Sequence, residues 1–208
     1  MSAVSVKKVE QPASFAFTPE NEAKIPGILA KYPAGREQSA VMALFWLAQK
    51  QNENWLPQAA IELVAKICNM PLIRAHEVAS FYTMYNLAPV GKHFIQCCTT
   101  TPCWLAGSDA VVKACRDTLG IEVGETTRDG MFTLREVECL GACANAPMVQ
   151  IDSHDASELF YEDLTYDSTR EIILQLKRGE KPKVGSQTGR KSSEPLGGGI
   201  TLTGKAGA

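Results

Sequence analysis

The sequence lacks the features of several classes of protein. No apolar run in its 208 residues approaches the roughly 20 residues that a membrane-spanning helix requires. A formal net charge of −2 provides neither a basic surface for nucleic acid nor a polybasic patch for direct membrane binding. We therefore expect no nucleic-acid partner, and membrane contact only indirectly, through another protein.

Cysteine is too sparse for a disulfide scaffold, since there are seven in the chain and the number is odd. No secretory signal is visible, because Lys7 and Lys8 are followed by polar residues rather than an apolar core. The first 35 residues contain no Arg, which a mitochondrial transit peptide would carry. We expect a reducing compartment, the bacterial cytoplasm or alternatively the mitochondrial matrix, where clustered cysteines bind metal more often than they form disulfides.

Helical patterns follow a short polar arm. Residues 1–17 are predicted to be a flexible N-terminal arm, and residues 18–88 a small helical bundle domain. Thr18 is an N-cap candidate, with Pro19 at the first helical position and Glu20 in the first turn. Apolar residues at helical spacing predict short helices over about 18–33, 36–52, 55–68 and 71–85. No metal-ligand or acid–base cluster occurs there, so we interpret the domain as a scaffold.

Beyond Pro89 the pattern changes to short β-branched runs. Strands are predicted at 93–98, 132–138, 148–151 and 159–161, with helices at 105–119 and 166–178 and a polar turn at 152–158. This order predicts an α/β domain over residues 89–180, and its opening of strand, cysteine loop and helix is that of a thioredoxin-like domain. Residues 181–208 are rich in Gly, Lys, Ser and Pro and are predicted to form an extended tail, disordered alone, that packs on a partner. The predicted fold class is therefore α+β.

Four cysteines form two pairs in turn sequences. Cys98 and Cys103 occur in C-T-T-T-P-C, and Cys139 and Cys143 occur in C-L-G-A-C, each pair next to the end of a predicted strand. Amides of a tight turn can point at the sulfurs and favour thiolates, which are the metal-binding form. Two loops that each donate two sulfurs can build a Cys₄ cage, as iron–sulfur centres need.

Spacing alone leaves three interpretations of this cage open. The first is an iron–sulfur cluster. The second is structural zinc, which also accepts four thiolates but favours a two-residue knuckle that both pairs lack. The third is a redox dithiol, for which Cys98 and Cys103 are too far apart in sequence and which leaves the second pair unexplained.

The other cysteines are expected to be packing residues. Cys97 adjoins Cys98, and side chains alternate across a strand, so only one of the two can readily face the site. The other should lie on the opposite face as a small buried hydrophobe. Cys68 and Cys115 lie on apolar faces of predicted helices.

Several motifs resemble those of a known family. They are C-T-T-T-P-C at 98–103, E-C-L-G-A-C-A-N-A-P-M-V-Q-I at 138–151 and S-F-Y-T-M-Y-N at 80–86, within a match from F-T-P-E-N at 17–21 to G-R-K-S-S-E-P at 189–195. Together they resemble the 24 kDa (E) subunit family of respiratory complex I, NADH:quinone oxidoreductase. The resemblance implies a thioredoxin-like [2Fe–2S] ferredoxin domain. It also implies that Cys98, Cys103, Cys139 and Cys143 bind one [2Fe–2S] cluster, one iron to each pair. The family usually has an apolar residue at the position of Cys97, which favours Cys98 as the ligand.

The implied function is electron transfer within an NADH dehydrogenase. The cluster would exchange an electron with FMN on a partner flavoprotein. That partner, and not this chain, would bind FMN and NADH. No complete active site is expected here, and the other partners implied are the iron–sulfur subunits of the peripheral arm. The implied location is the cytoplasmic side of the bacterial inner membrane or the mitochondrial matrix side. Alternatives are the equivalent subunit of an NAD-linked hydrogenase or formate dehydrogenase, and a zinc-stapled interaction module.

Overall fold

In a computed structural model the chain forms two compact units, residues 1–90 and residues 91–208. The structure describes residues 9–154 and 156–192. Among these residues, no helix combines the length and the apolar character needed to cross a membrane. Outside the described residues lie parts of the predicted arm and tail, residues 1–8 and 193–208, and residue 155.

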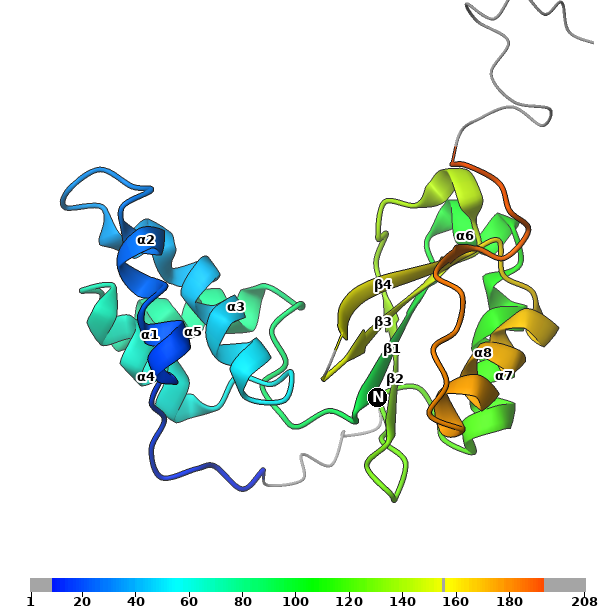
Figure 1. Ribbon diagram of the computed structural model, residues 1–208, viewed down its shortest axis with the longest axis horizontal. Helices are drawn as coiled ribbons and strands as arrows, with labels where there is room; N and C mark the ends of the chain where they lie inside the picture. Colours follow the sequence, from blue (N-terminus) through cyan, green and yellow to red (C-terminus); the bar gives the residue numbers. More distant parts are fainter. Residues whose placement is uncertain (1–8, 155, 193–208) are drawn as a thin grey trace, which may run out of the picture. The chain divides into compact units, whose positions relative to one another are not determined.

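The first unit consists of short helices (Figure 1). Most of them begin at or next to a proline. Its elements are α1 (Pro19–Glu22), α2 (Ile25–Leu29), the 3-10 helix η1 (Glu37–Ala40), α3 (Val41–Gln51), α4 (Gln58–Ile67) and α5 (Leu72–Phe81). Pro57 and Pro71 are the N-cap residues of α4 and α5. The helix predicted over 18–33 is divided into α1 and α2, because Pro26 has no N–H to donate to the carbonyl of Glu22.

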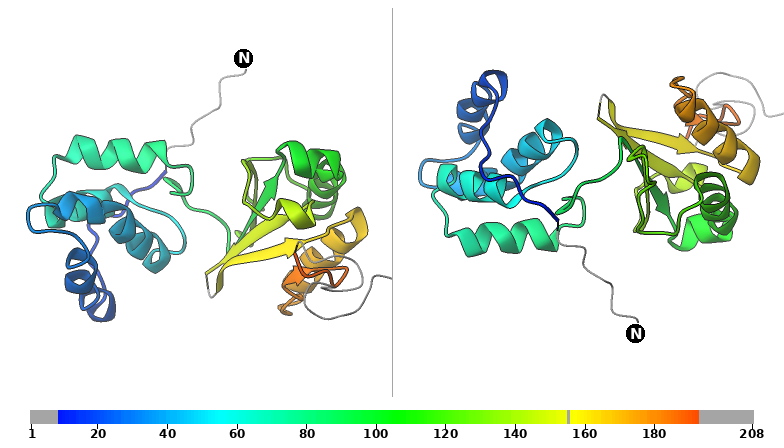
Figure 2. Two further views of the ribbon diagram at one scale, coloured as in Figure 1. Left: turned by 90° about the horizontal axis from the view of Figure 1, so that it is seen from above. Right: turned by 90° about the horizontal axis from the view of Figure 1, so that it is seen from below.

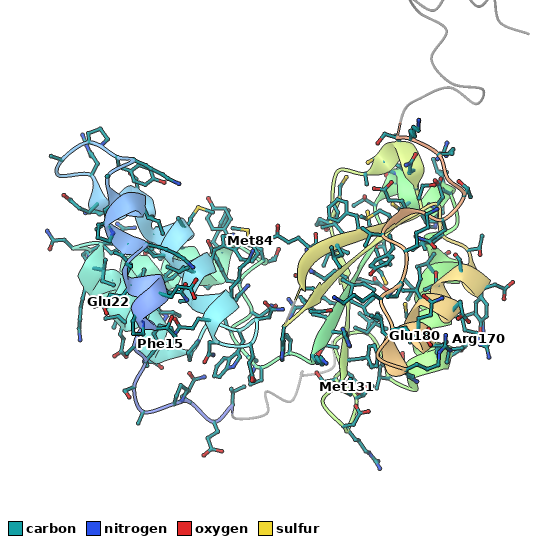
Figure 3. All side chains as sticks on the ribbon, viewed as in Figure 1. Phe15, Glu22, Met84, Met131, Arg170 and Glu180 are labelled. Carbon is teal, nitrogen blue, oxygen red and sulfur yellow. The ribbon has the colours of Figure 1, made fainter. Side chains whose placement is uncertain are left out.

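The helices of the first unit meet in one apolar core. Leu44 and Phe45 of α3 and Val64 of α4 are fully buried in it. Phe15 and Met84, labelled in Figure 3, pack against the same core, although they lie near opposite ends of the unit in sequence. The unit therefore has a core of its own.

The second unit is built on a five-stranded sheet in the order β2-β1-β3-β4-β5. The strands are β1 (His93–Cys98), β2 (Phe132–Val137), β3 (Val149–Ser153), β4 (Ala156–Glu162) and β5 (Gly185–Ser186). The helices are α6 (Thr101–Leu105), α7 (Ser108–Leu119), the 3-10 helix η2 (Cys143–Asn145) and α8 (Tyr166–Lys177). β1 pairs parallel with β2 and antiparallel with β3. The predicted α+β class is confirmed, because α6 and α7 supply the crossover that a parallel pair requires.

Helices α7 and α8 cover one face of this sheet (Figures 1 and 2). Ile95 and Cys97 of β1 share a core with Val111 of α7 and Ile173 of α8. Because side chains alternate along a strand, Cys98 points to the opposite face. Figure 3 labels Arg170 on α8 and Glu180 just beyond its end.

Gly91 precedes β1 at a place where a side chain cannot fit. A Cβ atom there would lie 2.7 Å from the backbone carbon of Phe132. The Gly91 amide donates to the Thr133 hydroxyl at 2.6 Å. The glycine therefore lets the chain enter the sheet close against the start of β2.

The β3–β4 hairpin has longer strands than predicted. The predicted turn at 152–158 is mostly strand, since β3 continues to Ser153 and β4 starts at Ala156; residue 155 lies outside the described residues. The Asp152 carboxylate accepts a hydrogen bond from Gln96 Nε2 at 3.0 Å. Polar residues that suggested a turn are therefore satisfied by neighbouring strands.

The first part of the predicted tail has structure of its own. Gly185 and Ser186 form β5 and pair with β4. The Ser186 hydroxyl donates to Asp163 Oδ2 at 2.6 Å, and Arg190 forms an ion pair with the same carboxylate. Composition did not indicate these contacts, which join residues 185–190 to the domain. That the tail packs on a partner stays a prediction.

Candidate metal centre

The first cysteine loop connects β1 directly to α6. Cys98 is the last residue of β1, and Cys103 lies within α6. Thr100 is the N-cap of α6, and Pro102 lies in its first turn, where its fixed φ favours the helix start. Cys98 and Cys103 are each 1% exposed, so this loop holds both thiols inside the unit.

The second cysteine loop follows β2 and is more open. Cys139 lies just after β2, and Cys143 begins η2. Both residues are exposed, and their Sγ atoms are 3.3 Å apart. Gly141 between them has a φ of +85°, in the left-handed region that glycine adopts without a Cβ penalty. The turn therefore brings the two thiols together at the surface.

The two loops meet at one edge of the sheet. β1 and β2 run parallel with their last residues in register, so the chain leaves both strands at the same edge. Cys98, Cys103 and Met148 form a small buried cluster, against which Leu140 of the second loop packs. Cys143 is close enough to interact electrostatically with Cys98 and Cys103. The fold therefore brings together the two predicted cysteine pairs.

Hydrogen-bond donors around Cys98 favour its thiolate. Burial raises the pKa of the Cys98 thiol, but the hydroxyl and amide of Thr100, the Cys103 thiol and the Leu140 amide act in the opposite direction. The net result is a pKa below the ordinary value for cysteine. Cys98 Sγ lies 3.3 Å from Thr100 Oγ1, the contact through which the hydroxyl acts.

The pKa values of Cys103 and Cys143 are shifted upward instead. Burial, together with donation to Cys98, raises the pKa of Cys103 to about 12, although the Met148 amide opposes the shift. A hydrogen bond to Cys139, with a smaller effect of burial, raises the pKa of Cys143. Because metals bind thiolates, the protons on the thiols must leave when metal is loaded.

The donor set fits an all-cysteine [2Fe–2S] cluster. Each loop contributes one pair of sulfurs. Within the described parts of the chain, no three His, Cys, Asp or Glu side chains converge as the ligands of a single metal ion do. The Thr100 hydroxyl and the amides of Leu140 and Met148 are directed at the sulfurs. Four thiols with such donors are what a [2Fe–2S] centre uses for ligation and for tuning its potential.

Cys97 faces away from this site. Its Sγ lies 3.9 Å from Cys115 Sγ, in the core between the sheet and the helices. The hydrogen bond with Cys115 and complete burial raise the pKa of Cys97 well above the ordinary value. The expectation that Cys97 and Cys115 are buried packing residues is confirmed, and Cys68 is likewise fully buried, with a pKa raised by burial to about 11.

Some groups at the site were not predicted from the sequence. The Thr100 hydroxyl lies within C-T-T-T-P-C, so its position in the motif was a usable signal. The Leu140 amide lies in a turn whose amides were expected to point at the sulfurs, whereas Met148 lies outside both cysteine motifs and its amide had no signal.

Sequence comparisons relate the chain to known proteins. A sequence model of thioredoxin-like [2Fe–2S] ferredoxins matches residues 25–177. The chain is 51% identical over 188 residues to NADH dehydrogenase (ubiquinone) flavoprotein 2, mitochondrial, of Dictyostelium discoideum, covering 90% of this chain and 74% of the relative. It is also 51% identical over 164 residues to the E subunit of NADH-quinone oxidoreductase from Rickettsia bellii (strain RML369-C), covering 79% of this chain and 95% of the relative.

A solved structure shows the same fold. A chain of an NAD+-reducing [NiFe]-hydrogenase in the H2-reduced state superposes with a TM-score of 0.54 at 19% identity. The match covers 76% of this chain but only 24% of the hydrogenase chain. At this identity the likeness concerns the fold alone.

Proposed function

Because the chain belongs to the thioredoxin-like [2Fe–2S] ferredoxin family, as its cysteine motifs predicted, we propose that it is an electron-transfer subunit of an NADH:quinone oxidoreductase. In this proposal Cys98, Cys103, Cys139 and Cys143 hold one [2Fe–2S] cluster. The observation that carries the proposal is the meeting of the two cysteine loops at one edge of the sheet.

The residues of the site have distinct roles in this proposal. Cys98 and Cys103 hold one iron from inside the unit, and Cys139 and Cys143 hold the other from the surface. When bound, the cluster would accept and hold one electron at a time. The Thr100 hydroxyl and the loop amides stabilise negative charge on the sulfurs, while buried Met148 keeps water from the inner pair.

The proposed partner is a flavoprotein subunit that binds FMN and NADH. This chain would then carry no complete active site, and its exposed cysteine pair would be the accessible side of the metal centre. Directly after Cys103, α6 exposes Trp104 by 57% and Leu105 by 74%. Large apolar side chains of this kind suit the core of a protein–protein interface.

The proposal extends to the assembly and its location. The remaining partners are the iron–sulfur subunits of the peripheral arm. The chain lies on the cytoplasmic side of a bacterial inner membrane, or on the matrix side in mitochondria, and reaches the membrane only through the complex.

Metal and sulfide analysis of the purified full chain tests the proposed cofactor. We expect about two irons and two sulfides per chain for a [2Fe–2S] centre, a visible iron–sulfur absorption and an EPR signal on reduction. A colourless protein with one zinc per chain would contradict the redox function. Identification of co-purifying subunits from the native host tests the partner, and a hydrogenase or formate dehydrogenase would contradict the assignment to a quinone-linked complex.

A further inference from the structure

Arg190 connects the tail to the second cysteine loop. Its Nε and Nη2 atoms donate to Asp163 Oδ1 at 3.0 and 2.6 Å. The same Nη2 donates to the backbone carbonyl of Ala144 at 2.8 Å. Ala144 directly follows Cys143, so one guanidinium joins the tail, the loop after β4 and the backbone beside a predicted ligand.

Asp163 is fixed by the tail as well. Its carboxylate accepts hydrogen bonds from the hydroxyls of Ser186 and Thr188, at 2.6 and 3.2 Å. The Asp163 side chain is 8% exposed, whereas that of Arg190 is 37% exposed. Burial raises the pKa of Asp163, but the hydrogen bonds from Arg190, Ser186 and Thr188 outweigh it, and the pKa lies below the usual value. The carboxylate is therefore a stable anchor for the guanidinium.

The second cysteine loop rests on the segment that contains Asp163. The Asp163 amide donates to the Asn145 carbonyl at 2.8 Å, and the Asn145 side chain donates to Glu162 at 2.7 Å. Arg190 adds the contact at Ala144, next to the thiol-bearing residue. Since Cys143 is exposed, its position depends on how its backbone is held rather than on burial.

We propose that Arg190 is a positioning residue for Cys143, which holds the second cysteine loop in a ligand-ready conformation and places a positive charge beside the cluster. The proposal rests on the proposed function for its effect on the cluster, but the holding of the loop stands independently. Lysine cannot replace arginine fully, because one ammonium lacks the planar fork that donates to Asp163 and Ala144 together.

Hydrogen–deuterium exchange of the metal-free full chain tests the holding of the loop. In R190A, and to a lesser degree in R190K, we expect amide exchange over residues 142–146 to be about tenfold faster, as loss of a charge-assisted hydrogen bond predicts. The matched control is R178A, because Arg178 also pairs with carboxylates, those of Glu171 and Glu180, and is 48% exposed. If exchange over residues 142–146 in R190A equals that in the wild type, the proposal is overturned, whether or not the chain binds iron.

Cluster retention and reduction potential test the effect on the metal centre. We expect iron–sulfur absorbance to be lost about tenfold faster in R190A and D163N than in the wild type and R178A. Reduction adds negative charge, so the potential should shift negative in R190A and positive in D163N, and stay close to wild type in R190K. A general loss of stability would not give opposite signs, so shifts of the same sign in R190A and D163N would overturn the electrostatic part. If the wild-type chain binds no iron and exchange is still faster in R190A, only the proposed function is refuted, and the holding of the loop by Arg190 stands.

Discussion

The two cysteine loops present their sulfurs in different ways. Cys98 and Cys103 are buried and belong to regular elements, the end of β1 and the helix α6. Cys139 and Cys143 are exposed, and the backbone around Cys143 is held by polar contacts from the β4–α8 segment and the tail. The inner half of the site therefore depends on the core of the domain, whereas the outer half depends on a few surface hydrogen bonds.

Serine substitution at either loop should have the largest effect. We expect Cys98→Ser and Cys139→Ser each to reduce the EPR signal of the reduced cluster at least about tenfold, because a weakly acidic hydroxyl replaces a thiolate ligand. Only Cys98→Ser should also lower the free energy of unfolding of the metal-free chain, by about 1 kcal/mol, because its hydroxyl is buried. A full EPR signal from Cys139→Ser would show that the ligand set is wrong.

Alkylation of the metal-free chain separates the two loops directly. Cys139 and Cys143 should react with iodoacetamide about a hundredfold faster than Cys98 and Cys103, because the buried pair must wait for local opening. Peptide mass spectrometry against time gives the rate at each site. Equal alkylation rates at all four thiols would contradict the difference in burial between the two pairs.

Cys97 provides the control for Cys98, since the two residues are neighbours on opposite faces. Cys97→Ser should leave the EPR signal intact and lower the free energy of unfolding by about 1–2 kcal/mol, because it introduces a hydroxyl into the apolar core beside Cys115. Urea denaturation and EPR measure the two effects. Loss of the signal in a stably folded variant would reassign the ligand from Cys98 to Cys97.

The smallest effect should come from the Thr100 hydroxyl. Thr100→Val removes a donor to the Cys98 sulfur, so the thiolate is less stabilised and the pKa of Cys98 rises. Thiolate absorbance of the metal-free chain should then appear at a higher pH than in the wild type. Thr101→Val, at an exposed position of the same loop, is the control. An unchanged titration in Thr100→Val would show that the hydroxyl does not act on Cys98.

Sequence patterns predicted the inner part of the site well. β1 ends at Cys98 as predicted, because a β-branched and aromatic run is followed by a Thr-Pro turn. The opposite orientations of Cys97 and Cys98 follow from strand geometry alone. The motifs alone predicted a cage of four thiols. That the cage binds a [2Fe–2S] cluster came from the family resemblance, since spacing had left zinc open.

The outer part of the site was less predictable. The contacts of Arg190 with Asp163 and Ala144 join residues far apart in sequence, and no local pattern signals such a pairing. The polar composition of the tail predicted disorder there, but the hydroxyls of Ser186 and Thr188 and the Arg190 guanidinium bind the nearly buried carboxylate of Asp163. Periodicity describes how an element buries its own apolar face, and it does not report polar contacts between distant segments.

The parallel pairing of β1 with β2 also sets when the site can exist during folding. Two parallel strands cannot form a simple hairpin, so the segment with α6 and α7 must cross over before the strands align. Pairing of this non-local kind forms late and slowly, because loop closure costs entropy before any contact repays it. Until β1 and β2 pair, the two cysteine loops are therefore separate, and they meet only once these two strands are aligned. Under the proposed function, insertion of the cluster would then select chains in which β1 and β2 have paired.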